Sequence, residues 1–322
     1  MWCACWKKRG RHISSLTAIT GTAWPNFVIL FGLALVLDLA FGSRRLLGWL
    51  PGPDDFLVRL TSFLTQRLDR ATRSPSERLV RGIIVLVLFL PAFFWVGRAI
   101  DPLLFLSPMS FVAFALLLSL LLRQHRLWAG IIRDSKSAAF ERHELTRENI
   151  TRATFGFADT LMCNLVVFAV GGFALLLPYR FLRAAIDQNI GLNAARPDSP
   201  FLKPFWLIAE IAALPGSILA TFLIAAAHIF IPGTRLVAFL APLRGRKGAL
   251  PSRLMPLSAL AHGLNLSFRF APGKRQPWIG PKEGRAKQTS ADLRKAGLVI
   301  LVATLLSLLI MLMLLALVLS SQ

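Results

Sequence analysis

The stretch Gly297–Leu319, GLVILVATLLSLLIMLMLLALVL, contains no charged residue and no proline. A helix needs about 20 apolar residues to cross the hydrocarbon core of a bilayer, at about 1.5 Å of rise per residue. The stretch meets that length, so it predicts a transmembrane helix. The sequence as a whole predicts an all-α integral membrane protein with four to six transmembrane helices. Five further apolar blocks precede this one, at 24–41, 82–97, 103–122, 157–178 and 204–232.

The basic residues lie between these blocks in alternating numbers. Lys and Arg number 4 before the first block, then 8, 1, 7, 4 and 13 in the successive loops, and 0 after the last block. The segments with 8, 7 and 13 would share one side of the membrane. Because cytoplasmic loops are enriched in Lys and Arg, we expect that side to be the cytoplasm. The pattern predicts a multi-pass protein of the bacterial inner membrane.

The composition agrees with a membrane protein, with 55% hydrophobic residues and a mean hydropathy of +0.60. The net charge of +21 and the pI near 11.5 would be compatible with nucleic-acid binding. The basic residues flank membrane segments, however, and a single Tyr is present to stack on bases. We therefore expect anionic lipid of the inner leaflet as the partner of this charge, and no nucleic acid.

Two apolar blocks are interrupted. The block 157–178 contains Gly171-Gly172, and the block 204–232 contains Leu214-Pro215-Gly216. Broken helices occur at membrane depth only where protein or a water-filled cavity satisfies the freed backbone groups. Both blocks could be full spans, or both could be re-entrant hairpins from the cytoplasmic side. The re-entrant arrangement would bring Asp159 and Arg180 to the same face.

A separate amphipathic helix is predicted at 54–71, between the first two blocks. Its apolar residues recur at helical spacing with arginines between them, which favours a helix lying in the headgroup plane. The longest polar segment, 233–296, is rich in Gly, Pro, Lys and Arg. We expect a basic cytoplasmic loop there, with little core of its own.

Three carboxylates fall inside apolar blocks, where an ionisable group costs at least a few kcal/mol and marks a candidate site. Asp38 is expected to pair with Arg44 or Arg45. Asp159 could be a helix cap or a ligand. Glu210 could belong to a buried ion pair or be a functional carboxylate.

No motif for a metal or a nucleotide is evident. Cys3 and Cys5 have no second Cys or His pair at zinc-site spacing, and Cys163 lies inside an apolar block. The histidines show no HExxH pattern, and no Walker loop, GxGxxG or GxSxG is present. From these residues alone we predict neither a metal site nor a cofactor.

Several short motifs occur in a family-like order. The chain reads RQPWIG at 275–280 and ADLRKA at 291–296, directly before the last apolar block. This resembles the end of the CobD/CbiB family of cobalamin-biosynthesis membrane proteins. The family's Asp, Gly-Gly and Tyr-Arg/Lys fit without gaps on Asp159, Gly171-Gly172 and Tyr179-Arg180. Arg133-Asp134-Ser135 is similar to its Gly-Arg-Asp-Thr, and Leu37-Asp38 with Gly42 to its Leu-Asp-x-x-x-Gly.

The resemblance implies ATP-dependent amide formation between adenosylcobyric acid and aminopropanol or its phosphate. It therefore implies ATP and Mg²⁺ as cofactors and a corrinoid intermediate as a partner. The candidate substrate-binding residues that it gives are Asp38, Arg133, Asp134, Asp159, Tyr179, Arg180, Trp278, Gly280 and Asp292.

The chain departs from the family where carboxylates are expected. Leu50-Pro51 stands in place of the family's His-Pro, and its Asn-Thr-x-Asp is replaced by 183–186, with Asp187 nearby. Only Pro215 remains of its Asp-Asp-x-x-Asn-x-x-Pro-x-Arg. No residue is therefore predicted to be catalytic. The alternative is a non-catalytic membrane sensor or interaction protein, comparable to the AmpE branch of the same superfamily; a transporter is a weaker third option.

Overall fold

The chain is built from helices, which confirms the predicted all-α class. The computed structural model describes residues 29–38, 52–70, 72–105, 108–122, 132, 143–190, 197–235, 244–245, 248–249, 251–269 and 278–320. Within these ranges four helices are long and apolar enough to cross a membrane. In the described part of the chain, the strands form two antiparallel pairs, and each strand is two residues long.

The elements follow one another along the chain with a short apolar helix at Ile29–Asp38 first. They are α3 (Pro53–Leu68), α4 (Pro75–Ile100), η1 (Asp101–Phe105), α5 (Pro108–Leu122), α7 (His143–Phe155), the π-helix η2 (Gly156–Met162), α8 (Cys163–Ile190), η3 (Pro200–Leu202), α9 (Lys203–Ala227), η4 (His228–Phe230), β1 (Arg244–Gly245), β2 (Gly248–Ala249), α10 (Leu254–Leu264), β3 (Phe268–Arg269), β4 (Trp278–Ile279) and α11 (Ser290–Ser320).

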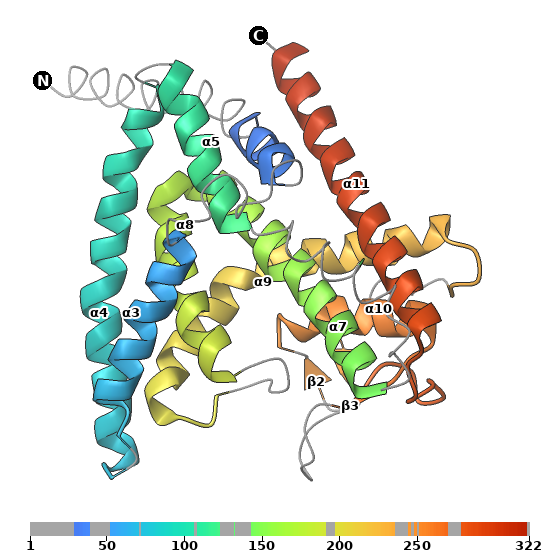
Figure 1. Cartoon of the computed structure of the whole chain (residues 1–322), viewed down its shortest axis with the longest axis horizontal. Coiled ribbons are helices and arrows are strands. Elements are labelled where there is room, and N and C mark those ends of the chain that lie inside the picture. Colours follow the sequence, from blue (N-terminus) through green and yellow to red (C-terminus); the bar gives the residue numbers. More distant parts are fainter. Residues whose placement is uncertain are drawn as a thin grey trace, which may run out of the picture.

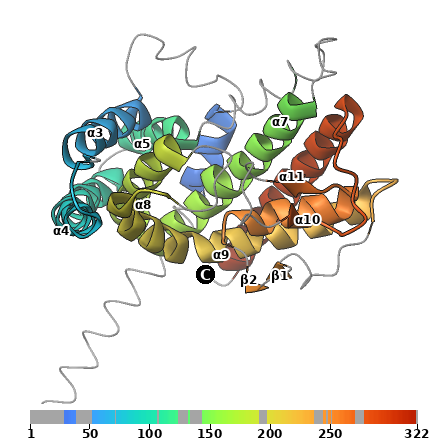
Figure 2. The ribbon, with the colours of Figure 1, turned by 90° about the horizontal axis from the view of Figure 1, so that it is seen from below.

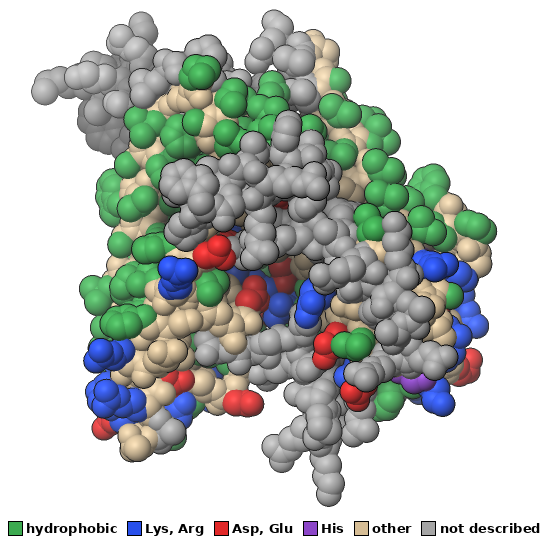
Figure 3. All heavy atoms as spheres, viewed as in Figure 1, with side chains coloured by type: hydrophobic (Ala, Val, Ile, Leu, Met, Phe, Trp, Pro, Cys, Tyr) green, Lys and Arg blue, Asp and Glu red, His purple; other side chains and the backbone are tan. Residues whose placement is uncertain are grey.

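The helices α4 and α11 stand at opposite edges of the molecule, with α7, α8 and α9 between them (Figure 1). Both expose large apolar side chains along much of their length, among them Val87 and Trp95 on α4 and Leu317 on α11. Hydrophobic side chains cover the upper part of the face in Figure 3, and charged side chains gather in its lower part. This division fits a protein whose apolar part faces lipid and whose charged part faces water.

The long helix α7–η2–α8 folds back on itself at Gly171-Gly172. Gly172 has φ 58° and ψ −149°, a conformation open to glycine and strained for other residues. Asp159 and Arg183 are in contact although 24 residues separate them, whereas a straight helix would place them about 36 Å apart. The chain is therefore bent back at the glycine pair of the block 157–178, as the re-entrant alternative requires, and the depth that the hairpin reaches in the membrane stays a prediction. We call 157–170 the first arm of this hairpin and 173–190 the second.

The tip of the hairpin is attached to the end of α4. The backbone N–H of Phe173 donates to Oδ1 of Asp101 at 2.9 Å. The first N–H groups of a helix have no partner within that helix, so an acceptor is needed there. Asp101 thus provides the acceptor for a free backbone N–H at the start of the second arm. This arm packs along α4 (Figure 2).

The helix α9 crosses the first arm at Gly216. A Cβ added to Gly216 would lie 2.5 Å from the Cα of Cys163, so the two backbones are in direct contact. The Cys163 thiol donates to the carbonyl of Ala213 at 3.4 Å. Pro215 does not break the helix, because α9 runs continuously from Lys203 to Ala227. Of the two alternatives left open for the block 204–232, α9 has the continuous helix that a full span requires.

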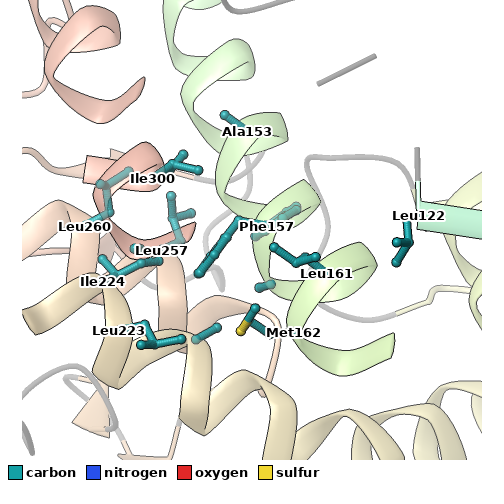
Figure 4. Close-up of a cluster of buried hydrophobic side chains, with 14 of the residues drawn as sticks. Leu122, Ala153, Phe157, Leu161, Met162, Leu223, Ile224, Leu257, Leu260 and Ile300 are labelled. Carbon is teal, nitrogen blue, oxygen red and sulfur yellow. The ribbon is translucent and has the colours of Figure 1, made fainter. Parts of the chain in front are cut away.

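The main core lies where the first arm, α9, α10 and α11 meet. Figure 4 shows Phe157 and Met162 facing Leu223, Leu257 and their neighbours from these helices. The apolar residues of α10 other than Leu264 are buried, which the predicted polar loop at 233–296 did not anticipate. An apolar run of 11 residues is too short to signal a span, and basic residues surround it in the sequence.

The amphipathic helix predicted at 54–71 is present as α3. It buries Leu57 against the second arm and exposes Phe56 and Phe63. In Figure 1, α3 lies beside the lower part of α4. Its placement in the headgroup plane stays a prediction.

Candidate functional site

A buried cluster of ion pairs joins the two arms of the hairpin. The guanidinium of Arg183, on the second arm, donates to the carboxylate of Asp159 on the first arm and to Asp187 at 3.0 Å. Arg183 and Asp159 are both buried. Asp159 lies in η2. Such π-helical turns are rare in proteins, and those that occur are often found at functional sites.

A second arginine reaches the same carboxylates from the segment that leads into α10. Nε of Arg253 lies 3.2 Å from Oδ2 of Asp159, and its Nη2 lies 3.1 Å from Oδ1 of Asp187. The Cζ atom of Arg253 also lies 4.4 Å from the ring centroid of Phe155. Asp159 and Asp187 are therefore each shared by two arginines.

Arg180 forms a further buried pair with Asp54, at the start of α3. Its Nε donates to Oδ1 of Asp54 at 3.1 Å, and its Nη2 donates to Oδ2 of the same carboxylate. Three aspartates and three arginines thus face one another across α3, the hairpin and α10. Buried charges require such pairing, because an isolated ion in a low-dielectric interior costs several kcal/mol.

Glu210 holds the segment before α10 in place. Its Oε2 accepts a hydrogen bond from the backbone N–H of Ser252 at 2.7 Å. Neither predicted role, a buried ion pair or a functional carboxylate, is needed to explain this contact. Glu210 positions Ser252, and thereby Arg253 beside it.

Part of the hydrogen-bonding capacity of the cluster is unused. Oδ1 of Asp159, Nε of Arg183, the hydroxyl of Tyr179 and the hydroxyl of Ser252 are buried without a hydrogen-bond partner in the part of the chain that the structure describes. Buried polar groups in proteins are nearly always paired. Such atoms therefore indicate a place where a water molecule or a ligand can bind.

Of the residues singled out in the sequence, the structure brings Asp159, Tyr179 and Arg180 into this region, on facing arms of the hairpin. Asp38 is buried at the end of its short helix. Arg133 and Asp134 lie outside the described residues, as do Arg44, Arg45, Cys3 and Cys5.

Trp278, Gly280 and Asp292 belong to a different part of the fold. Trp278 pairs in β4 with Arg269 of β3, and Gly280 follows it with φ 109°. Asp292 accepts hydrogen bonds from the backbone N–H and the hydroxyl of Thr289, at 2.8 and 2.9 Å. It thereby caps the start of α11, and it also pairs with Arg285 at 2.6 Å. These contacts give Asp292 a structural role.

Sequence reasoning missed Asp54 and Arg253 as members of the cluster. Arg183 and Asp187 were noted only as replacements of a family motif, although their i, i+4 spacing favours an ion pair on one helix face. No local signal marks Arg253, because its partners lie far away in the chain.

The described residues do not fit Mg²⁺ with ATP. Within them, no group of three His, Cys, Asp or Glu side chains is placed to hold a metal ion. Asp159 and Asp187 already face two guanidinium groups. A hard cation such as Mg²⁺ needs free carboxylate oxygens, and these carboxylates do not offer them.

The chain has a distant relative among known proteins. The chain is 27% identical to a protein of Sinorhizobium sp named "Cobalamin biosynthesis protein CobD", over an alignment of 304 residues covering 83% of this chain and 92% of that protein. No family model matches the chain, and no solved structure matches it. The alignment supports a distant relationship to CobD over most of the chain.

Proposed function

We propose that this chain acts in cobalamin biosynthesis, as a multi-pass protein of the bacterial inner membrane. The step we propose is the joining of adenosylcobyric acid to aminopropanol or its phosphate. The distant relationship to CobD supports the pathway. The observation that carries the proposal is the buried cluster, because the family-matched Asp159 and Tyr179-Arg180 face it from both arms.

The chain's own residues supply positioning in this proposal. The ion pairs of Asp159 and Arg183 hold the two arms together, and Asp54 with Arg180 fixes α3 against the second arm. The unpartnered Tyr179 hydroxyl and Asp159 Oδ1 are available to a bound molecule. A corrinoid intermediate would approach from the charged side, where α3, α7 and α11 have their polar ends.

The second candidate is a non-catalytic membrane protein, comparable to AmpE, with a sensing or interaction role. One observation favours it. Asp159 and Asp187 are neutralised by Arg183 and Arg253, so they are poor ligands for a metal-bound phosphate.

Complementation separates the two candidates. The gene is expressed in a strain that lacks its own cobinamide-forming enzyme, and cobinamide formation from cobyric acid is measured. Restored formation supports the amide-coupling step, and Asp159→Asn should then reduce it at least about tenfold, whereas the exposed control Asp198→Asn should not. Protein that accumulates in the membrane without restoring formation would exclude the coupling step and leave the non-catalytic candidate.

A further inference from the structure

The guanidinium of Arg253 occupies a cage made by other elements. Oδ2 of Asp159 and Oδ1 of Asp187 contact it at 3.2 and 3.1 Å, and the ring of Phe155 lies against its face at 4.4 Å. These three residues come from η2, α8 and α7. The cage is therefore built by the hairpin helix alone, and Arg253 enters it from outside.

The cage opens toward solvent on one side. The side chain of Asp159 is 6% exposed, that of Arg253 is 12% exposed and that of Asp187 is 44% exposed. Arg253 thus lies between a buried carboxylate and a carboxylate at the surface. Ser252, next to it, is attached to the protein through the hydrogen bond of its backbone N–H to Glu210.

Two carboxylates and an aromatic face form a site for an organic cation. The ring attracts a positive charge by its quadrupole, and the carboxylates accept N–H donors. A metal ion needs several free oxygen ligands, and the oxygens here are already shared with Arg183. The unpartnered Oδ1 of Asp159 leaves one more acceptor for an N–H group.

We infer that this cage is a binding site for a small organic cation, a guanidinium or an alkylammonium, and that Arg253 is its internal occupant. When the side chain of Arg253 withdraws, while Glu210 keeps the backbone of Ser252 in place, Asp159 and Asp187 keep only Arg183 between them, and the group carries one net negative charge. A cationic ligand restores the balance. The inference goes beyond amide coupling and does not depend on it, because it concerns binding alone.

The first test replaces the occupant. The full-length protein and its Arg253→Ala variant are purified in nanodiscs and titrated with ethylguanidinium and with ethylammonium, while the thermal unfolding midpoint is followed. At least one cation should raise the midpoint of Arg253→Ala saturably, with an apparent Kd at least tenfold lower than for the unchanged protein. The uncharged N-ethylurea should have no effect. Arg285→Ala, which removes an exposed pair with Asp292, should behave like the unchanged protein.

Second variants locate the binding. In the Arg253→Ala background, Phe155→Leu keeps an apolar side chain but removes the ring face, and should weaken cation binding about threefold or more. Asp159→Asn in the same background should weaken it about tenfold or more. Saturable binding that neither change affects would place the cation elsewhere and overturn the inference. So would Mn²⁺ binding to Arg253→Ala, seen by electron paramagnetic resonance, without any response to the organic cations.

A measurement on the unchanged protein covers the case in which Arg253→Ala does not fold. Phenylglyoxal modifies accessible arginines, and the modified residues are identified by mass spectrometry. Ethylguanidinium or ethylammonium should increase the modification of Arg253 and leave that of Arg183 unchanged. If modification of Arg253 is the same with and without both cations, the site does not exchange its occupant and the inference is wrong.

Discussion

Asp101 accepts a hydrogen bond from the backbone N–H of Phe173 at 2.9 Å. This contact joins the end of α4 to the tip of a hairpin 72 residues further along the chain. The contact lies at the end of α4 remote from its polar start at Pro75. It fixes how far the hairpin reaches along α4, and through the hairpin it fixes the positions of Arg180 and Arg183.

Removing this acceptor should destabilise the protein. Asp101→Ala leaves the start of the second arm without its acceptor, and we expect a loss of about 1–2 kcal/mol in the free energy of unfolding. Unfolding in mixed micelles with increasing SDS measures the change. Ser74→Ala removes the cap of α4, whose hydrogen bond from Glu77 is exposed, and should cost less. Equal losses would mean that Asp101 has no special role.

The crossing of α9 over the first arm should not tolerate a side chain at Gly216. Gly216→Ala places a Cβ 2.5 Å from the backbone of Cys163, so the helices must separate, at about 1–3 kcal/mol. The same unfolding measurement applies. Gly32→Ala is the matched control, since nothing lies within 4 Å of its added Cβ. That change should be neutral or stabilise the helix by up to about 1 kcal/mol. Similar losses at both glycines would contradict the close crossing.

The Asp54–Arg180 pair should show strong coupling in a double-mutant cycle. Asp54→Asn leaves a buried guanidinium without its counter-ion and should cost about 3–5 kcal/mol of unfolding free energy. Arg180→Gln should cost a similar amount, and the double variant should lose clearly less than the sum of the two. Arg285→Gln, whose side chain is 55% exposed, should change stability by less than about 1 kcal/mol. Simple additivity at 54 and 180 would rule out the buried pair.

The hairpin fold predicts the membrane sidedness of the start of α9. Because the chain turns back at Gly171-Gly172, Asp198 should lie on the same side as Ser76 at the start of α4. Cysteine is placed at either exposed position, in a background with Cys3 and Cys5 replaced by Ser. A membrane-impermeant thiol reagent should then label both from the cytoplasmic side. Labelling of Asp198→Cys from the opposite side would mean that the block 157–178 crosses completely.

The sequence predicts well what depends on local composition. The apolar block 297–319 is the greater part of α11, and the glycine pair at 171–172 marks the turn of the hairpin. Gly-Gly alone left two alternatives open, because the direction of the chain after the turn depends on tertiary contacts. Asp101 supplies one of these contacts, and no pattern around it indicates a partner at Phe173.

The candidate site was predictable only in part. Asp159 stood out because it is charged within an apolar block, and Arg180 stood out through the family resemblance. Arg253 lies 94 residues after Asp159, in a basic segment where one arginine resembles the next. Arg253 reaches the cluster because α10, which begins directly after it, packs into the core. Asp292 was singled out through the family resemblance as a substrate-binding candidate; the structure shows its bonds to Thr289 at the start of α11, and the binding role stays a prediction.

The pairing of Asp159 with Arg183 also bears on how the protein enters the membrane during synthesis. A charged residue at the centre of the bilayer adds about 2.5–3.5 kcal/mol to the free energy of inserting its helix, and Asp159 and Arg183 would each carry part of this penalty. An arm released singly by the translocon would carry its share of that penalty without compensation. If both arms leave the translocon together, the charges neutralise each other during the transfer. We therefore expect the two arms to enter the bilayer together. The ribosome would then have to synthesise the chain through Arg183 before Asp159 reaches its final position.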